Sequence, residues 1–105
     1  MNTNLKHKVQ VLGDPTRLAI FERLGEGPLA VVDIARGFDI TRPAISQHLK
    51  ILKDAGLVTG QKAGNRRLYR IDPKGVAELR DYFQDFWSEA LASFKQVVEE
   101  TENPP

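Results

Sequence analysis

Glycine and proline interrupt this chain so often that no regular element before residue 73 can exceed about 15 residues. Two of the interruptions are the pairs Asp14-Pro15 and Asp72-Pro73. Such a pair suits the start of a helix, because the Asp carboxylate accepts a hydrogen bond from a free amide and proline needs no amide partner in the first turn. The pattern predicts several short elements and then one long helix. The other breaks fall at Gly13, residues 25–28, Gly37, Gly56 and Gly64.

Apolar residues recur at helical spacing between these breaks, which predicts helices over residues 3–12, 15–24, 29–36 and 41–55. The last two are joined by a short turn. The helix over 41–55 has Thr41 as its candidate N-cap and tolerates Pro43 in its first turn. Its apolar side consists of Ile45, Leu49 and Leu52. Its opposite side carries hydrogen-bonding and mainly basic groups, namely Arg42, Ser46, Gln47, Lys50 and Asp54.

Two short segments rich in β-forming residues, 57–59 and 68–71, predict a hairpin over residues 57–71. Between them Gly64-Asn65 allows a sharp reversal, and the connecting loop is expected to present Lys62, Arg66 and Arg67 together. From Pro73 to about residue 100 apolar residues alternate spacings of three and four, which predicts a long helix. The predicted fold is therefore a single domain over residues 1–105, mainly α with a small β-hairpin.

The formal net charge of +1 conceals an uneven distribution along the chain. Residues 41–70 contain seven Lys and Arg residues against the single acid Asp54, a net charge of +6. Residues 71–105 contain three basic and eight acidic residues, a net charge of −5. A basic segment of this kind is typical of a surface that binds a polyanion, although a solvated face can have the same composition.

The composition also excludes several kinds of chemistry. The 105 residues include no cysteine, which excludes disulfides, thiolate metal ligands, cysteine nucleophiles and thiol redox sensing. The sequence contains no glycine-rich phosphate loop, no His-Glu-x-x-His string and no recognisable nucleophile setting, so we expect neither an enzyme nor a bound cofactor. It has no apolar run long enough for a signal peptide or a membrane span, and we expect a cytoplasmic protein with no membrane partner.

The basic helix and the basic hairpin can serve one ligand, double-stranded DNA. A helix of about 15 residues spans roughly 22 Å and fits the major groove, where Gln47 or Arg42 can address base edges. Lys50 suits a phosphate, and the hairpin arginines suit the neighbouring backbone or a narrowed minor groove. For His48, beside the apolar side, a structural hydrogen bond is the simpler role. The predicted DNA-binding residues are Thr41, Arg42, Pro43, Ser46, Gln47, His48, Lys50, Lys62, Asn65, Arg66 and Arg67.

Five strings in this order resemble the ArsR/SmtB family of bacterial winged helix-turn-helix repressors, over about residues 5–80. The resemblance implies a homodimer that binds an imperfect inverted repeat in a promoter and represses by occlusion. It also implies that the recognition helix is 41–55 and that the wing is 60–67. The strings are Asp14-Pro15-Thr16-Arg17-Leu18, residues 29–34, Ser46-Gln47-His48-Leu49-Lys50-Ile51-Leu52, Ala55-Gly56-Leu57-Val58 and Arg67-Leu68-Tyr69-Arg70.

The chain departs from the metal-sensing members of that family. Where they carry a cysteine pair, this chain has Ala30 and Val32, neither of which can ligate a metal. Residues 73–105 contain no histidine. Three carboxylates at four-residue spacing could in principle hold a hard metal, but a solvated acidic stripe is the commoner use of such a pattern, and we expect no metal site. These carboxylates are Asp81, Asp85 and Glu89.

Five of the eight aromatic residues lie in the final helix. They can pack against the first helix of the same chain or pair with a second copy across a two-fold axis, and we expect some of each. An apolar pocket beneath them could hold a small-molecule effector. The alternative function is a protein-interaction module that uses this helix as its binding surface, but the basic and amide groups on helix 41–55 favour DNA. The predicted dimer residues are Leu5, Val9, Phe83, Phe86, Trp87, Ala90, Leu91 and Phe94.

Overall fold

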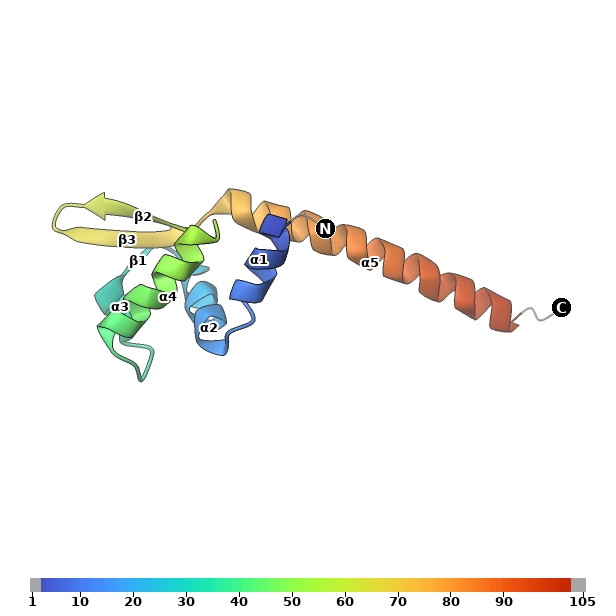
Figure 1. Ribbon diagram of the computed structural model, residues 1–105, viewed down its shortest axis with the longest axis horizontal. Coiled ribbons are helices and arrows are strands. Elements are labelled where there is room, and N and C mark those ends of the chain that lie inside the picture. The colour runs from blue at the N-terminus through green and yellow to red at the C-terminus, as the bar shows by residue number, and fades with distance from the viewer. Residues whose placement is uncertain (1–2, 103–105) are drawn as a thin grey trace.

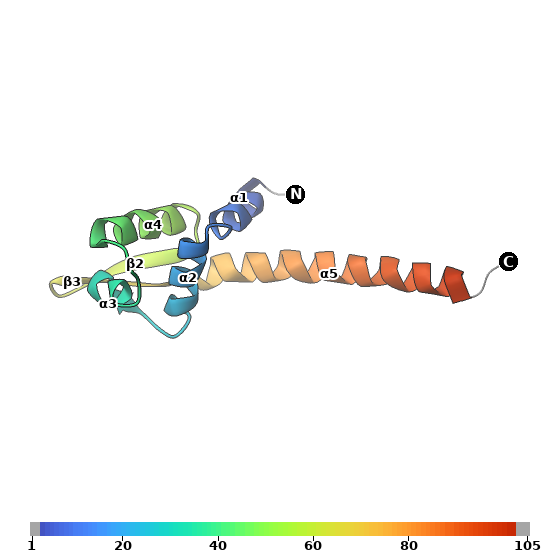
Figure 2. The same ribbon diagram turned by 90° about the horizontal axis from the view of Figure 1, so that it is seen from below.

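The computed structural model describes residues 3–102 and contains five helices and three short strands (Figure 1). Helices α1 to α4 and the sheet form a body from which α5 projects, and the turned view in Figure 2 shows the same projection. The predicted class, mainly α with a small sheet, is confirmed. In chain order the elements are α1 (Thr3–Val11), α2 (Pro15–Leu24), β1 (Leu29–Ala30), α3 (Val31–Ala35), α4 (Arg42–Asp54), β2 (Val58–Ala63), β3 (Arg66–Ile71) and α5 (Pro73–Glu102).

The predicted caps start two of these helices. The backbone amide of Arg17 donates to Asp14 Oδ2 at 2.9 Å at the start of α2. This hydrogen bond is the main cause of a lowered pKa for the Asp14 carboxyl group, because it stabilises the charged form. The backbone amide of Ala44 donates to Thr41 Oγ1 at 3.3 Å at the start of α4. In both helices a proline occupies the first turn, as the sequence predicts.

The core of the body is a single cluster of buried apolar side chains. Its centre is the inner side of α4, where Ile45, Leu49 and Leu52 are completely buried. The spacing of these three residues places them on one face of a helix with 3.6 residues per turn. The fully buried residues that surround them are Ile20, Ile34, Leu57 and Val58.

The predicted helix over residues 29–36 is wrong at its start. Leu29 and Ala30 form strand β1, which pairs in antiparallel fashion with Tyr69 and Leu68 of β3, and α3 begins only at Val31. The result is a three-stranded sheet in the order β1-β3-β2 rather than a hairpin alone. The pairing partner lies some 40 residues further along the chain, and local helical spacing carries no information about it.

The predicted loop of the hairpin is also wrong in its length. Strand β2 continues to Ala63 and β3 begins at Arg66, so that only Gly64 and Asn65 form the turn. Gly64 has φ +64°, a conformation that glycine adopts without strain. The register pairs Lys62 with Arg67 and Ala63 with Arg66. The cationic residues of the hairpin therefore lie on paired strands and not in a loop.

The first turns of α5 lie against the body, and the remainder does not. Lys8 of α1 is buried and its Nζ lies 3.3 Å from Glu78 Oε2 of α5. Gly75 packs directly against the backbone of Gly56, which follows α4. Leu79 is the last buried residue of α5. Nearly every later residue of the helix is exposed, so α5 has a docked start and a long uncovered stretch.

Gly75→Ala is expected to lower the free energy of unfolding by about 1–3 kcal/mol. A Cβ at this position would overlap the carbonyl oxygen of Gly56, and this clash outweighs the intrinsic preference of a helix for alanine, about 1 kcal/mol. Urea denaturation followed by circular dichroism measures the change. Lys74→Ala, at the exposed neighbouring position, is the control and should stay within about 0.5 kcal/mol of the wild type. A Gly75→Ala variant as stable as the wild type would contradict the close packing.

Candidate nucleic-acid interface

The outer side of α4 gathers the predicted base-reading residues. Because the apolar side faces the core, Arg42, Ser46 and Gln47 are turned outward, and all three are exposed. They are joined on this side by the exposed Lys50, one turn further along the helix. With 13 residues, α4 is about 20 Å long. The helix thus presents amide, hydroxyl and cationic groups along one continuous face.

Two of the predicted DNA-binding residues also have structural roles in α4, and a third, His48, is partly buried. The Thr41 hydroxyl accepts the capping hydrogen bond from Ala44, and Pro43 is part of the first turn. His48 is half-buried at the inner edge of the helix, and its Nδ1 is buried with no hydrogen-bond partner in the described part of the chain. The structural hydrogen bond expected for His48 is therefore not formed at this nitrogen. His48 lies close enough to Asp14 to add to the lowering of that carboxyl pKa, after the larger effect of the Arg17 amide. His48 is therefore less accessible than its neighbour Gln47.

Lys50 has an acidic neighbour on its own helix. Its Nζ lies 3.6 Å from Asp54 Oδ2, one turn along α4, and both side chains are well exposed. An exposed pair of this kind contributes little to stability and exchanges readily with solvent. Lys50 is thus free to move its ammonium group toward an incoming anion.

The wing, expected at residues 60–67, is formed in the structure by the whole hairpin of β2 and β3, residues 58–71. It carries the second group of predicted contacts. Lys62 and Arg67 are directly opposite each other in the ladder and share one face of the hairpin. Arg66 is next to Arg67 on β3 and points to the other face, because side chains alternate along a strand. Asn65 is exposed at the turn. The expectation that Lys62, Arg66 and Arg67 are presented together is therefore wrong: the structure brings the first and third together and separates Arg66.

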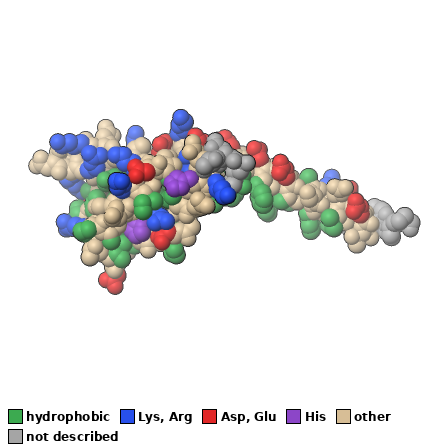
Figure 3. Space-filling view, in the orientation of Figure 1, with side chains coloured by type: hydrophobic (Ala, Val, Ile, Leu, Met, Phe, Trp, Pro, Cys, Tyr) green, Lys and Arg blue, Asp and Glu red, His purple; other side chains and the backbone are tan. Residues whose placement is uncertain are grey.

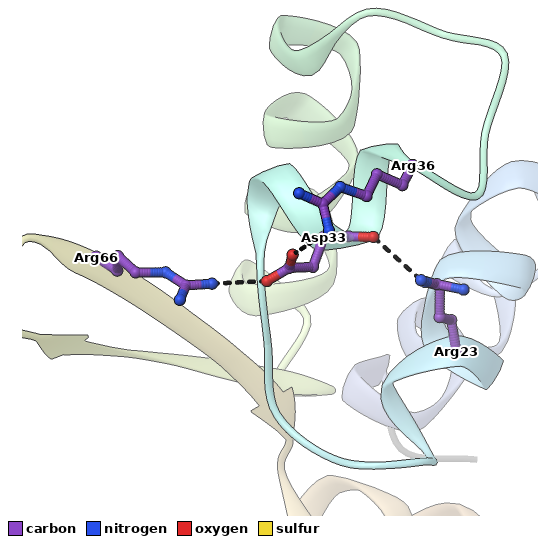
Figure 4. Close-up of polar contacts among 4 residues, drawn as sticks. All are labelled: Arg23, Asp33, Arg36 and Arg66. Atoms are coloured by element: carbon purple, nitrogen blue, oxygen red, sulfur yellow. Dashed lines mark hydrogen bonds and ion pairs between the residues drawn. The ribbon is translucent and has the colours of Figure 1, made fainter.

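Arg66 is held by an acidic residue that the sequence did not single out (Figure 4). Its Nη2 donates to Asp33 Oδ2 of α3 at 2.6 Å, and Arg36 Nη1 lies 3.3 Å from Asp33 Oδ1. Arg23 of α2 donates to the backbone carbonyl of Asp33 at 3.1 Å. Because 33 residues separate Asp33 from Arg66, no local pattern in the sequence could have linked them.

The separation of charge along the sequence, basic in residues 41–70 and acidic in residues 71–105, is also a separation on the surface of the folded chain. In Figure 3, Lys and Arg side chains gather over the wing, whereas acidic side chains follow one edge of α5 and hydrophobic ones the opposite edge. The carboxylates Asp81, Asp85 and Glu89 belong to this helix and are exposed. Among residues 3–102, no group of three or more His, Asp or Glu side chains is arranged to hold a metal ion. Within the same range, no helix is long and apolar enough to cross a membrane.

The predicted dimer residues are mostly uncovered. The large apolar side chains of the stripe on α5 are between 48% and 67% exposed, and Val9 of α1 is 36% exposed. Ala90 is exposed as well, whereas Leu5 is half-buried against the core cluster. The first helix therefore does not cover the aromatic stripe within this chain. The stripe consists of Phe83, Phe86, Trp87, Leu91 and Phe94.

Comparison with known proteins places this architecture in a family. Residues 12–61 match the family model described as "Helix-turn-helix domain". The chain is 51% identical over 90 residues to the HTH-type transcriptional regulator Rv2034 of Mycobacterium tuberculosis. The aligned residues make up 86% of this chain and 84% of that protein.

Solved structures of other proteins are also similar to this chain, among them the following two. A crystal structure of a "possible transcriptional regulator for arsenical resistance" has a TM-score of 0.70 at 41% identity and covers 82% of this chain and 94% of that one. The second is a solution structure of a homodimeric winged helix-turn-helix DNA-binding domain from Mycobacterium bovis, a possible ArsR-family regulator. Its TM-score is 0.67 at 31% identity, and the match covers 82% of this chain and 80% of that chain. The resemblance noted in the sequence is confirmed: the chain belongs to the ArsR/SmtB family of winged helix-turn-helix transcriptional regulators.

Proposed function

We propose that the chain is a homodimeric repressor that binds an inverted repeat in promoter DNA and blocks transcription by occupying it. The observation that carries this proposal is the outer face of α4, where base-reading and phosphate-binding groups form one exposed surface. A second group of Lys and Arg side chains gathers over the wing (Figure 3). The relatives named above are described as transcriptional regulators, which supports a DNA-binding function rather than catalysis. A protein that acts on a bacterial promoter works in the cytoplasm.

In this proposal α4 lies in the major groove, which is about 12 Å wide. Gln47 can make a bidentate contact to adenine and Arg42 to guanine, so these two side chains read sequence. Lys50 binds a phosphate and fixes the position of the helix on the duplex, without adding sequence information. Three other predicted DNA-binding residues, Thr41, Pro43 and Ser46, add contacts at the edge of the same groove.

The wing supplies a second contact to the backbone. Lys62 and Arg67 are like charges directly opposite each other in an antiparallel ladder, which is unfavourable when nothing lies between them. A phosphate oxygen placed beside both groups would relieve this repulsion. Because the hairpin follows α4 directly in the chain, it meets the duplex next to the groove that α4 occupies.

Two copies of the chain would pair through the exposed stripe of α5 together with Leu5 and Val9 of α1. The homodimeric solution structure of a family member supports this assembly. It would place two α4 helices about 34 Å apart, one turn of DNA, and so requires an inverted repeat.

The competing function, a module that binds another protein through α5, explains the exposed aromatic stripe but not the outer face of α4. That face would need neither amide nor cationic groups if DNA were not its partner. The DNA-binding function accounts for both surfaces.

Binding to DNA is expected to depend steeply on salt. With about six phosphate contacts, the slope of log affinity against log salt concentration should be near −5. Fluorescence anisotropy with a duplex selected from a random pool measures it. Gln47→Ala should cost about 1–3 kcal/mol on the selected site and relax its sequence preference, whereas Lys50→Gln should weaken all duplexes similarly. An affinity that does not change with ionic strength would contradict the proposal.

Trp87→Glu is expected to convert the dimer into a monomer, because it places a charge in the centre of the apolar stripe without a partner. Light scattering at micromolar concentration measures the mass. Ser88→Glu adds the same charge one position along α5, outside the stripe, and should leave the dimer intact. If the Trp87→Glu protein remained a full dimer, α5 would not be the interface.

Zinc and arsenite are expected to leave the DNA complex intact. Arsenite and thiolate-bound zinc need cysteine ligands, and the chain has none. The measurement is the anisotropy of the bound duplex during addition of either metal, after dialysis against a chelator. Release of the duplex at stoichiometric metal would show that this chain senses metal through other side chains.

A further inference from the structure

Asp33 lies on α3, where two arginines from different parts of the chain meet its carboxylate. Arg66 of the wing occupies Oδ2 at 2.6 Å, and Arg36, one turn along the same helix, lies 3.3 Å from Oδ1 (Figure 4). The Asp33 side chain is 26% exposed. Asp33, Arg36 and Arg66 together carry one negative and two positive charges, so the cluster has a net positive charge.

The contact between Asp33 and Arg66 is short but open to solvent. The Arg66 side chain is 57% exposed, so a phosphate can reach its guanidinium group while the ion pair is still formed. Ion pairs at such exposure are weak and break at little cost. A guanidinium group binds a phosphate in the same two-pronged geometry as it binds a carboxylate. A DNA phosphate is therefore a direct competitor of Asp33 for Arg66.

Arg36 makes this exchange inexpensive. When Arg66 leaves, the Asp33 carboxylate keeps a cationic partner at Oδ1 and is not left as an uncompensated anion near the DNA. The backbone of Asp33 is also fixed, because Arg23 donates to its carbonyl group. The acid and its retained partner stay in place while Arg66 moves.

The position of Arg66 in the sheet allows such a movement. Strand β1 supports β3 at Tyr69 and Leu68 but does not extend to Arg66. Arg66 is directly next to the turn, and its ladder partner Ala63 is exposed. The end of the wing is therefore held to the helical body by a side-chain contact rather than by backbone pairing with β1.

We propose that Asp33 is an internal counter-anion that occupies Arg66 in the DNA-free protein and is replaced by a DNA phosphate on binding, so that Asp33 sets an upper limit on DNA affinity. This inference rests on the proposed DNA-binding function. It assigns a role to an acidic residue outside α4 and the wing. Without the Asp33 charge, Arg66 should bind a DNA phosphate directly, because no carboxylate has to be displaced first.

The test measures affinity for a 30-base-pair duplex of random sequence by anisotropy at several salt concentrations. Asp33→Asn is compared with Asp39→Asn, which removes the same charge from the exposed loop before α4, where no ion pair to Asp39 is found among residues 3–102. Asp33→Asn should bind about two- to fivefold more tightly than Asp39→Asn, the strength of one exposed ion pair. Its salt slope should stay close to that of the wild type, because Arg66 contacts a phosphate in both complexes and only the cost of releasing Asp33 is removed. Asp33→Glu, which keeps the anion, should retain wild-type affinity.

The same comparison in an Arg66→Gln background tests whether Asp33 acts through Arg66. There, Asp33→Asn and Asp39→Asn should have equal effects, because the competition no longer exists. If Asp33→Asn and Asp39→Asn changed the DNA affinity equally in the protein that retains Arg66, the gain would come only from the loss of one negative charge. This result would overturn the inference. Weaker DNA binding by Asp33→Asn would overturn the inference too. Asp33 would then help DNA binding by holding the wing in place instead of competing with the DNA for Arg66. Circular dichroism establishes that each variant is folded.

These outcomes separate the two proposals. If the wild type binds the duplex with the expected salt dependence but the Asp33 variants behave like the controls, only the inference about Asp33 fails. If the wild type does not bind DNA in a salt-dependent manner, the proposed function fails and the inference fails with it.

Discussion

The burial of three side chains on the inner side of α4 is the interaction on which the rest of the molecule depends. Ile45, Leu49 and Leu52 are completely buried, and each such side chain contributes about 1.5–3 kcal/mol. Their packing against α2, α3 and β2 fixes the rotation of α4 about its own axis. A rotation by one residue position, 100°, would bury Ser46 in place of Ile45. The outward direction of Gln47 is thus a consequence of the core.

The parts of the fold that the sequence predicted are those that depend on neighbouring residues. Helix caps at Asp14 and Thr41, and the spacing of the apolar residues, are local features, and they located all five helices to within about two residues. Strand β1 was missed, because its formation depends on Tyr69 and Leu68, which lie far away in the chain. The wing strands were predicted too short, since cationic residues are poor indicators of a strand when considered without their cross-strand partners.

The candidate site was predicted in the same uneven way. The outer face of α4 could be predicted because the helical period that identifies the buried side also identifies the exposed side. The wing could not, because the charge of a segment gives no indication of which of its cations are already paired. Asp33 belongs to the electrically neutral first 40 residues, and Arg66 to the basic segment that follows. Only the folded chain brings the two together.

The junction between the wing and α5 has a mechanical consequence. Asp72 alone separates Ile71 of β3 from Pro73 of α5. Its amide donates to Leu57 O at 2.9 Å and its carboxylate accepts from the Lys74 amide at 3.0 Å, so both sides of the junction are fastened. These two hydrogen bonds limit the freedom of the hairpin to move independently of α5 at residue 72. In a dimer built on α5, a change of about 10° in the angle between the two helices would move the end of a wing about 20 Å long by about 3.5 Å, slightly more than the length of a hydrogen bond.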